Sequence, residues 1–362
     1  MRFLTGGESH GSGLVGIIDG IPANLFIDMD YINGELKRRQ SGYGRSERMK
    51  IEMDKADIIS GINDYKSTGA PISIFIKNKG TNIDTSEVYI PRPGHGDLVG
   101  SLKYNQKGGR NILERASARE TAMRVALGSI CKLLLREFKI EVLSHVIGIG
   151  NVFSPKTYYN EITIDELKSC DKTSLRVADK LSEDKMIHII DKSIESGDSL
   201  GGVIELVVKN VPIGLGSHTN WDNKLDANLG GALLSIPGIK AVEFGLGTAS
   251  SSTKGSEFHD EIIYSDTYTR TSNNAGGIEA GISNGEDIVI KIHMKPIPTL
   301  RKPLKTVNML SKEEELALSE RSDVCAVPSA SIVAESMVSL VIANEIKNKF
   351  GGDSMEELKR NY

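Results

Sequence analysis

Residues 117–138, with the sequence SARETAMRVALGSICKLLLREF, carry a helical pattern in the middle of the chain. Four apolar residues recur at spacings of three and four, which places them on one stripe of a helix: Met123, Leu127, Ile130 and Leu134. Ser117 and Glu120 have the spacing of a capping box, a common signal at a helix start. We therefore predict a long helix from Ser117 to Phe138 with one face in the core.

The segments around this helix predict the fold class. Asp30–Arg39 has acidic residues at its start and basic residues at its end, which suits a helix dipole. Ser329–Phe350 follows a proline and ends at two glycines, as helices often do. Seven short segments rich in β-branched residues predict strands: Leu14–Ile18, Ile51–Ile62, Ile72–Ile76, Val142–Ile149, Val203–Val208, Ala241–Phe244 and Ile288–Met294. The mixed order of helices and strands favours an α+β fold with mostly antiparallel sheets packed against helices.

The chain has enough apolar residues for a large core. Of its 362 residues, 39% are hydrophobic, which suffices for one large core or two smaller ones. At a typical length of about 150 residues per domain, the chain would hold two domains. However, no low-complexity linker divides it. We predict a single domain over residues 1–352 and a solvated C-terminal tail over residues 353–362. The polar stretch Ser154–Asp184 is a candidate surface insertion.

Composition and charge exclude several classes of protein. Lys and Arg number 44 and Asp and Glu number 48, so the formal charge is −4. Such a chain has no general attraction to nucleic acid or anionic lipid. Three cysteines without a CxxC pair indicate neither a disulfide framework nor a zinc site. We find no signal-peptide pattern and no run of about 18 apolar residues, so we expect no membrane span and a cytoplasmic protein.

Two histidines lie in glycine-rich settings. His10 lies in Gly7–Gly11 (GESHG), which matches the GxSxG nucleophile elbow of serine hydrolases. An elbow needs a preceding strand and a following helix, whereas a strand-like segment follows here, so we disfavour the hydrolase. His95 lies in the rigid loop 91–97 (PRPGHGD). Each histidine is either a structural turn residue or a proton donor near neutral pH; we interpret the other five as structural.

Arginines cluster in three places. Residues 38–48 (RRQSGYGRSER) form either a solvated charge run or a basic loop that grips carboxylate and phosphate. Arg115 and Arg119 flank the predicted start of the central helix, where cations oppose the dipole unless an anion docks there. Arg321 lies beside Asp323, which by itself indicates only a surface ion pair. A nucleic-acid site is disfavoured by the acidic total and by the 5% aromatic content.

These motifs together resemble the chorismate synthase family. Seven of them occur in the family's order: GESHG, RRQSGYGR, RPGHGD, GGRNILERASARETAMRVALG, TSNNAGGIEAGISNG, KPIPT and RSDVCAVPSASIVAE. They span nearly the whole chain, so the resemblance is specific. It implies a β-α-β sandwich, usually assembled as a homotetramer. It also implies a phosphate-lyase that converts 5-enolpyruvylshikimate 3-phosphate to chorismate by 1,4-anti elimination, in the last step of the shikimate pathway to aromatic amino acids.

The resemblance also implies roles for individual residues. Reduced FMN is required without net redox change; His10 matches the histidine that protonates it, and His95 the one that protonates the departing phosphate. Asp323 matches an acid that assists the flavin as a base. Three arginines match positions for substrate and nicotinamide nucleotide: Arg39, Arg45 and Arg119. The remaining matches are FMN positions: Arg115, Ala116, Ser117, Pro237, Gly238, Ala280, Lys295, Pro296, Ile297, Pro298, Thr299 and Arg321.

Pro237 and Gly238 differ in residue type from the family's usual pair. The basic loop leaves open whether NADPH or an external reductase reduces the FMN. The rival interpretations are an ordinary flavin or nicotinamide oxidoreductase, which would consume reductant stoichiometrically, and an RNA-binding module that uses the two basic segments.

Overall fold

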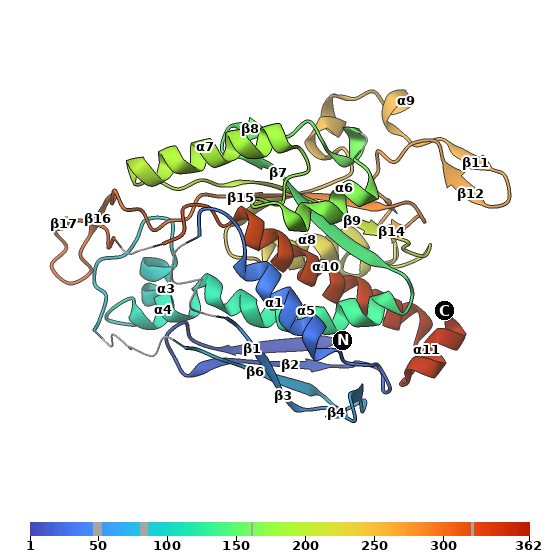
Figure 1. Cartoon of the computed structure of the whole chain (residues 1–362), viewed down its shortest axis with the longest axis horizontal. Coiled ribbons are helices and arrows are strands. Elements are labelled where there is room, and N and C mark those ends of the chain that lie inside the picture. The colour runs from blue at the N-terminus through green and yellow to red at the C-terminus, as the bar shows by residue number, and fades with distance from the viewer. Residues whose placement is uncertain (46–52, 80–85, 161, 320–321) are drawn as a thin grey trace.

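Two antiparallel sheets enclose a layer of helices (Figure 1). The structure is a computed structural model that describes residues 1–45, 53–79, 86–160, 162–319 and 322–362. The first sheet has the strand order β1 (Arg2–Gly7), β2 (Gly13–Asp19), β6 (Ile72–Lys77), β3 (Ala56–Ser60), and each neighbouring pair is antiparallel. The second has the order β10 (Ile239–Phe244), β15 (Ile288–Met294), β9 (Gly202–Lys209), β7 (Glu141–Ile149), β8 (Val152–Phe153), again antiparallel throughout.

The helices between the sheets form the centre of the core. They are α1 (Met29–Gln40), α5 (Thr121–Arg136), α8 (Leu225–Leu234) and α10 (Val327–Phe350). α5 and α10 pack closely because Gly128 has no side chain: a Cβ there would lie 2.5 Å from Cβ of Ser336. α10 is long and apolar enough to cross a membrane, but 89% of its apolar window is buried inside the protein. We therefore interpret α10 as a core helix.

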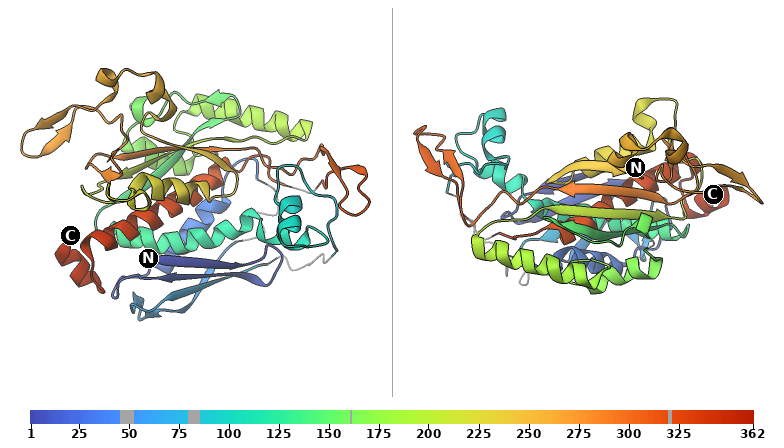
Figure 2. Two further views of the ribbon diagram at one scale, coloured as in Figure 1. Left: turned by 180° about the vertical axis from the view of Figure 1, so that it is seen from behind. Right: turned by 90° about the horizontal axis from the view of Figure 1, so that it is seen from above.

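The other elements lie around this sandwich. α7 (Lys180–Ser196) contacts β8 at the edge of the second sheet, and two hairpins project from opposite ends of the molecule (Figures 1 and 2). These are β11 (Ile262–Tyr264) with β12 (Tyr268–Arg270), and β16 (Lys305–Val307) with β17 (Glu314–Leu316). The remaining elements are β4 (Ile62–Asn63), β5 (Lys66–Ser67), α3 (Asp97–Lys103), α4 (Arg110–Arg115), α6 (Ile164–Ser169), α9 (Gly255–Phe258), β13 (Ile278–Glu279), β14 (Ile282–Ser283), α11 (Met355–Asn361) and the 3-10 turn η1 (Ala118–Glu120).

The predicted α+β fold with antiparallel sheets is confirmed, and it has the layers of a β-α-β sandwich. The predicted capping box at Ser117 is wrong. Ser117 caps the short turn η1, and Glu120 instead accepts a hydrogen bond from Thr5 Oγ1 and pairs with Arg124. α5 therefore begins only at Thr121.

Three further segments differ from the sequence-based expectation. The solvated tail predicted for residues 353–362 is wrong, because this segment forms α11 and buries Met355 and Leu358. A capping box of Ser354 and Glu357 starts that helix. The polar stretch Ser154–Asp184 is only partly superficial, since Arg176 and its apolar neighbours are buried. The predicted strand Ile51–Ile62 is shorter: β3 and β4 cover part of it, and residues 51 and 52 lie outside the described part.

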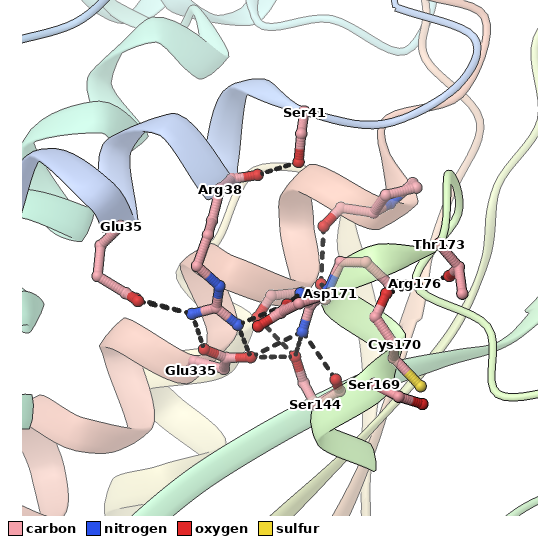
Figure 3. Close-up of polar contacts among 12 residues, drawn as sticks. Glu35, Arg38, Ser41, Ser144, Ser169, Cys170, Asp171, Thr173, Arg176 and Glu335 are labelled. Atoms are coloured by element: carbon pink, nitrogen blue, oxygen red, sulfur yellow. Dashed lines mark hydrogen bonds and ion pairs between the residues drawn. The ribbon is translucent and has the colours of Figure 1, made fainter. Parts of the chain in front are cut away.

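A cluster of paired charges joins α1, α5 and α10 to the segment between α6 and α7 (Figure 3). Glu335 of α10, only 1% exposed, accepts from Arg38 of α1 at 2.9 Å and from Lys132 of α5 at 2.6 Å. Arg176 also donates to Glu335, at 3.0 Å. Glu35 accepts from Arg38 at 2.8 Å and from Lys132 at 2.5 Å. With Asp171, which pairs with both arginines, three cations meet three anions, and this arrangement fixes α1 against α5 and α10.

Candidate active site

One cavity of about 470 Å³ collects most of the residues that the sequence singled out. His10 reaches it from the turn between β1 and β2, and His95 from the loop before α3. Asp323 reaches it from the segment before α10. The other predicted residues in its lining are Arg39, Arg45, Arg119, Ala116, Ser117, Pro237, Gly238, Lys295, Pro296, Ile297, Pro298 and Thr299.

His10 is held by a carboxylate on α4. Its Nδ1 lies 2.9 Å from Oε1 of Glu114, and its backbone N–H donates to Oε2 of the same residue at 2.8 Å. Ser9 Oγ donates to Oε2 as well, at 2.7 Å. Desolvation opposes ionisation of Glu114, but the hydrogen bonds from Ser9 and His10 outweigh it and lower the pKa of that carboxyl. A carboxylate therefore lies behind the ring, on the Nδ1 side.

His95 is held in a related way, with an added cation. Nδ1 of His95 lies 2.5 Å from Oδ1 of the fully buried Asp97. Arg92 Nε donates to Oδ2 of Asp97 at 2.9 Å, and Arg92 Nη1 donates to Thr299 Oγ1 at 2.9 Å. Although burial opposes ionisation, the hydrogen bonds from His95 and Arg92 lower the pKa of Asp97 far below its usual range. Both histidines of the cavity thus have an ionised carboxylate at Nδ1.

Three arginines line the cavity with incomplete hydrogen bonding. Arg39 and Arg119 share Asp54, whose oxygens lie 3.6 Å from Arg39 Nη1 and 2.6 Å from Arg119 Nη1. Arg45 Nη1 pairs with Asp323 at 2.8 Å. Within the described part of the chain, one buried nitrogen of each arginine has no hydrogen-bond acceptor: Arg39 Nη1, Arg45 Nε and Arg119 Nη2. These donors suit the carboxylate or phosphate oxygens of a ligand.

The crowding of these cations changes the proton affinity of the most buried one. Arg39 is only 4% exposed. Burial lowers the pKa of Arg39 to about 10, and the positive charges of Arg45 and Arg119 act in the same direction, against the attraction of Asp54. An incoming anion would relieve this strain, because it adds the negative charge that Asp54 and Asp323 supply only in part.

The segment 295–299 forms one wall of the cavity directly after β15. Pro296 and Pro298 make it extended and remove two N–H donors. Lys295 Nζ donates to the carbonyl of Gly94, which ties this wall to the loop of His95. Ser322 Oγ donates to the carbonyl of Thr299 at 2.8 Å and so ties the wall to the segment of Asp323. The wall presents small and apolar groups suited to a flat ring system.

Two predicted residues do not line the cavity, and a third lies outside the described residues. Arg115 donates to backbone carbonyls of Thr5 and Gly7 and lines a neighbouring hollow that shares Ala116, Ser117 and Pro237. Ala280 is exposed in the turn between β13 and β14, with a positive φ of 51°. Arg321 lies outside the described residues.

Sequence reasoning missed three residues that hold the site together: Asp54, Asn78 and Glu114. Asp54 lies in a predicted strand and pairs with two arginines, and Asn78 Oδ1 accepts from Arg119 Nε at 2.9 Å. Glu114 lies inside the central motif, one residue before Arg115. Its position in that motif was a usable signal, whereas nothing in the pattern around Asp54 or Asn78 indicates contact with a distant arginine.

Comparisons with known proteins agree with the motifs. The sequence model of the family described as chorismate synthase matches residues 1–346. The chorismate synthase of Alkaliphilus oremlandii is 50% identical over 378 aligned positions, covering 100% of this chain and 97% of that protein. That of Caldanaerobacter subterraneus subsp. tengcongensis is 51% identical over 368 positions, with the same coverage. A solved structure described as "Crystal Structure of Chorismate Synthase" superposes with a TM-score of 0.83 at 42% identity, covering 99% of this chain and 95% of that one. The chain therefore belongs to the chorismate synthase family, whose members are phosphate-lyases.

Proposed function

We propose that this chain eliminates phosphate from 5-enolpyruvylshikimate 3-phosphate to give chorismate, with reduced FMN bound beside the substrate and no net redox change. One observation carries the proposal: three guanidinium groups with unpartnered buried nitrogens surround the cavity that also holds both histidines. The substrate carries carboxylates and a phosphate, so it supplies the acceptors that these donors lack. We assign Arg39, Arg45 and Arg119 to its binding.

The residues present also fit a flavin. The extended wall Lys295–Thr299 and the small residues Ala116 and Ser117 would hold the ring system, and Pro237 and Gly238 lie on the same cavity. Reduced FMN, when bound, would supply the electron density that lets phosphate leave although the hydrogen to be removed is not acidic. FMN contacts from Arg115, Ala280 and Arg321 stay predictions, as does NADPH as the reductant.

The two histidines and Asp323, which all line this cavity, would move protons. We assign His95 to protonate the departing phosphate, because its imidazole lies beside Arg92, a cation that attracts the same group. We assign His10 to protonate the reduced flavin. Asp323, whose carboxylate is oriented by Arg45, would act as the base. His10 and Asp323 would thus serve the flavin, and His95 would serve the phosphate.

An anaerobic assay with dithionite-reduced FMN tests the proposal. We expect equal amounts of chorismate and phosphate from the wild-type protein. His10→Ala and His95→Ala should each retain FMN affinity and lose roughly 10²- to 10⁴-fold in kcat, as expected when a general acid is removed. Full activity in either variant would refute the role assigned to that histidine.

Assembly and compartment stay predictions. We expect a homotetramer from the family resemblance, and the projecting hairpin of β11 and β12 exposes Ile262, Tyr264 and Tyr268, which suits burial against another copy. Light scattering at several protein concentrations would test this. The three cysteines Cys131, Cys170 and Cys325 are free and buried, in keeping with a reducing compartment such as the cytoplasm.

A further inference from the structure

Glu114 makes an unusual number of contacts with two consecutive residues. Its Oε2 accepts from Ser9 Oγ at 2.7 Å and from the backbone N–H of His10 at 2.8 Å. Its Oε1 lies 2.9 Å from Nδ1 of His10. The backbone carbonyl of Glu114 also accepts from the Ser9 N–H, at 3.1 Å. Glu114 is not among the described residues that line the cavity, and it contacts that lining through Ser9 and His10.

These contacts define the state of the imidazole ring. An ionised carboxylate can only accept hydrogen bonds, so the Nδ1 that faces it must carry the proton. The neutral ring then has its lone pair on Nε2, and a protonated ring gives up the Nε2 proton to a ligand. Backbone and side chain of His10 are gripped by the same group, which fixes the ring's orientation as well as its tautomer.

We propose that Glu114 is the positioning residue of His10, which sets the tautomer so that proton exchange with a cavity ligand falls to Nε2. A related arrangement occurs at His95, where Asp97 lies at Nδ1 and Arg92 Nη2 lies 3.1 Å from the same atom. The part of this proposal that concerns turnover rests on the proposed function. The part that concerns the tautomer does not.

Glu114→Gln tests the proposal with minimal change of shape. An amide can accept from both the Ser9 hydroxyl and the His10 N–H only if its oxygen takes the place of Oε2. Its NH2 group then faces Nδ1 and requires a lone pair there, so the ring must move its proton to Nε2. We expect ring ¹⁵N chemical shifts of His10 to report Nδ1–H in the wild type and Nε2–H in the variant, with signals assigned from His10→Ala.

In turnover, Glu114→Gln should lower kcat roughly 10- to 100-fold, the usual effect of losing an orienting partner, with KM changed less than about twofold. In the His10→Ala background, Glu114→Gln should lower kcat no further, because Glu114 acts through the imidazole of His10. The matched control is Glu137→Gln, the same change at a partly exposed ion pair with Lys359 outside the cavity, which should leave rate and ¹⁵N shifts unchanged.

Glu114→Asp keeps the charge and guards against a glutamine variant that does not fold. It should retain the Nδ1–H tautomer and lose less activity than the glutamine variant. An unchanged His10 tautomer in Glu114→Gln, an Nε2–H tautomer in Glu114→Asp, or a full further loss in the His10→Ala background would overturn the proposal. Absence of chorismate from the wild type would instead refute the proposed function and leave the tautomer measurement decisive for Glu114.

Discussion

Arg38 and Arg39 are neighbours on α1, and their guanidinium groups lie in two different electrostatic environments. Arg38 joins the closed cluster of Figure 3, where it donates to Glu35 and Glu335. Arg39 lines the cavity, where it shares Asp54 with Arg119 at the longer distance of 3.6 Å. Burial opposes the charge of both, but Glu335 and Glu35 raise the pKa of Arg38, whereas burial lowers the pKa of Arg39.

The difference separates structural charge from functional charge. In the cluster, three cations meet three anions, and the pairs link α1, α5 and α10. Among the described residues of the cavity, the carboxylates that pair with Arg39, Arg45 and Arg119 are Asp54 and Asp323, so three cations meet two anions. A balanced cluster stabilises the fold without a ligand, whereas an unbalanced one is completed only when an anion binds.

Arg38→Met should give the largest effect on stability. Removing one partner of a buried ion pair leaves carboxylates that are less well compensated, at a cost of about 3 kcal/mol in the free energy of unfolding. Urea unfolding monitored by circular dichroism would measure it. A loss below about 1 kcal/mol would mean that the cluster of Figure 3 contributes little to the fold.

Arg39→Met, the same change at the next residue, should weaken substrate binding more than it weakens the fold. The substrate should bind about 1.5–3 kcal/mol more weakly, or roughly 10- to 150-fold, because a charge-assisted donor is lost. The free energy of unfolding without ligand should change by no more than about 1.5 kcal/mol, since Asp54 keeps Arg119 and a desolvated charge is removed. Titration calorimetry would measure the loss of substrate affinity, and urea unfolding of the same protein preparation would measure the change in stability. A variant that binds normally but unfolds easily would remove the distinction between the two arginines.

Acid pH should weaken the cluster by a smaller and graded amount. Although desolvation opposes it, Arg38, Lys132 and Arg176 lower the pKa of Glu335. The stabilising effect of Glu335 is therefore fully present above the pKa of about 4.3 that a glutamate has in the unfolded chain. The effect is lost as the pH falls towards the lower pKa of the folded state. Glu335→Gln should be less stable than wild type at pH 7 and lose less stability between pH 5 and pH 3. Parallel curves for the two proteins would contradict this account.

The sequence predicted the elements whose signals are local. The stripe from Met123 to Leu134, the β-branched strands and the proline and glycines around α10 all correspond to observed elements. Local signals were ambiguous where the same sequence spacing can make different side-chain contacts. Ser-x-x-Glu forms a capping box at Ser354, whereas the same spacing at Ser117 does not, because Glu120 pairs with Thr5 and Arg124 instead.

The site was predictable where family motifs carry it and hidden where tertiary pairing creates it. His10, His95 and the cavity arginines lie within motifs. The different roles of Arg38, in structural ion pairs, and Arg39, in the cavity, could not be predicted. Both belong to the same basic run, and only the fold decides which one contacts Glu335. Asp54 and Glu114 act through partners 65 and 104 residues away, and no local spacing records such contacts.

The ratio of chorismate formed to reduced FMN consumed tests the central claim most directly. Under anaerobic conditions, with substrate in excess over dithionite-reduced FMN, both can be followed in one cuvette by absorbance. We predict that chorismate and phosphate accumulate through many turnovers per FMN while the flavin stays reduced. Oxidation of one FMN for each product would indicate an oxidoreductase, and the absence of chorismate would refute the assignment of this cavity.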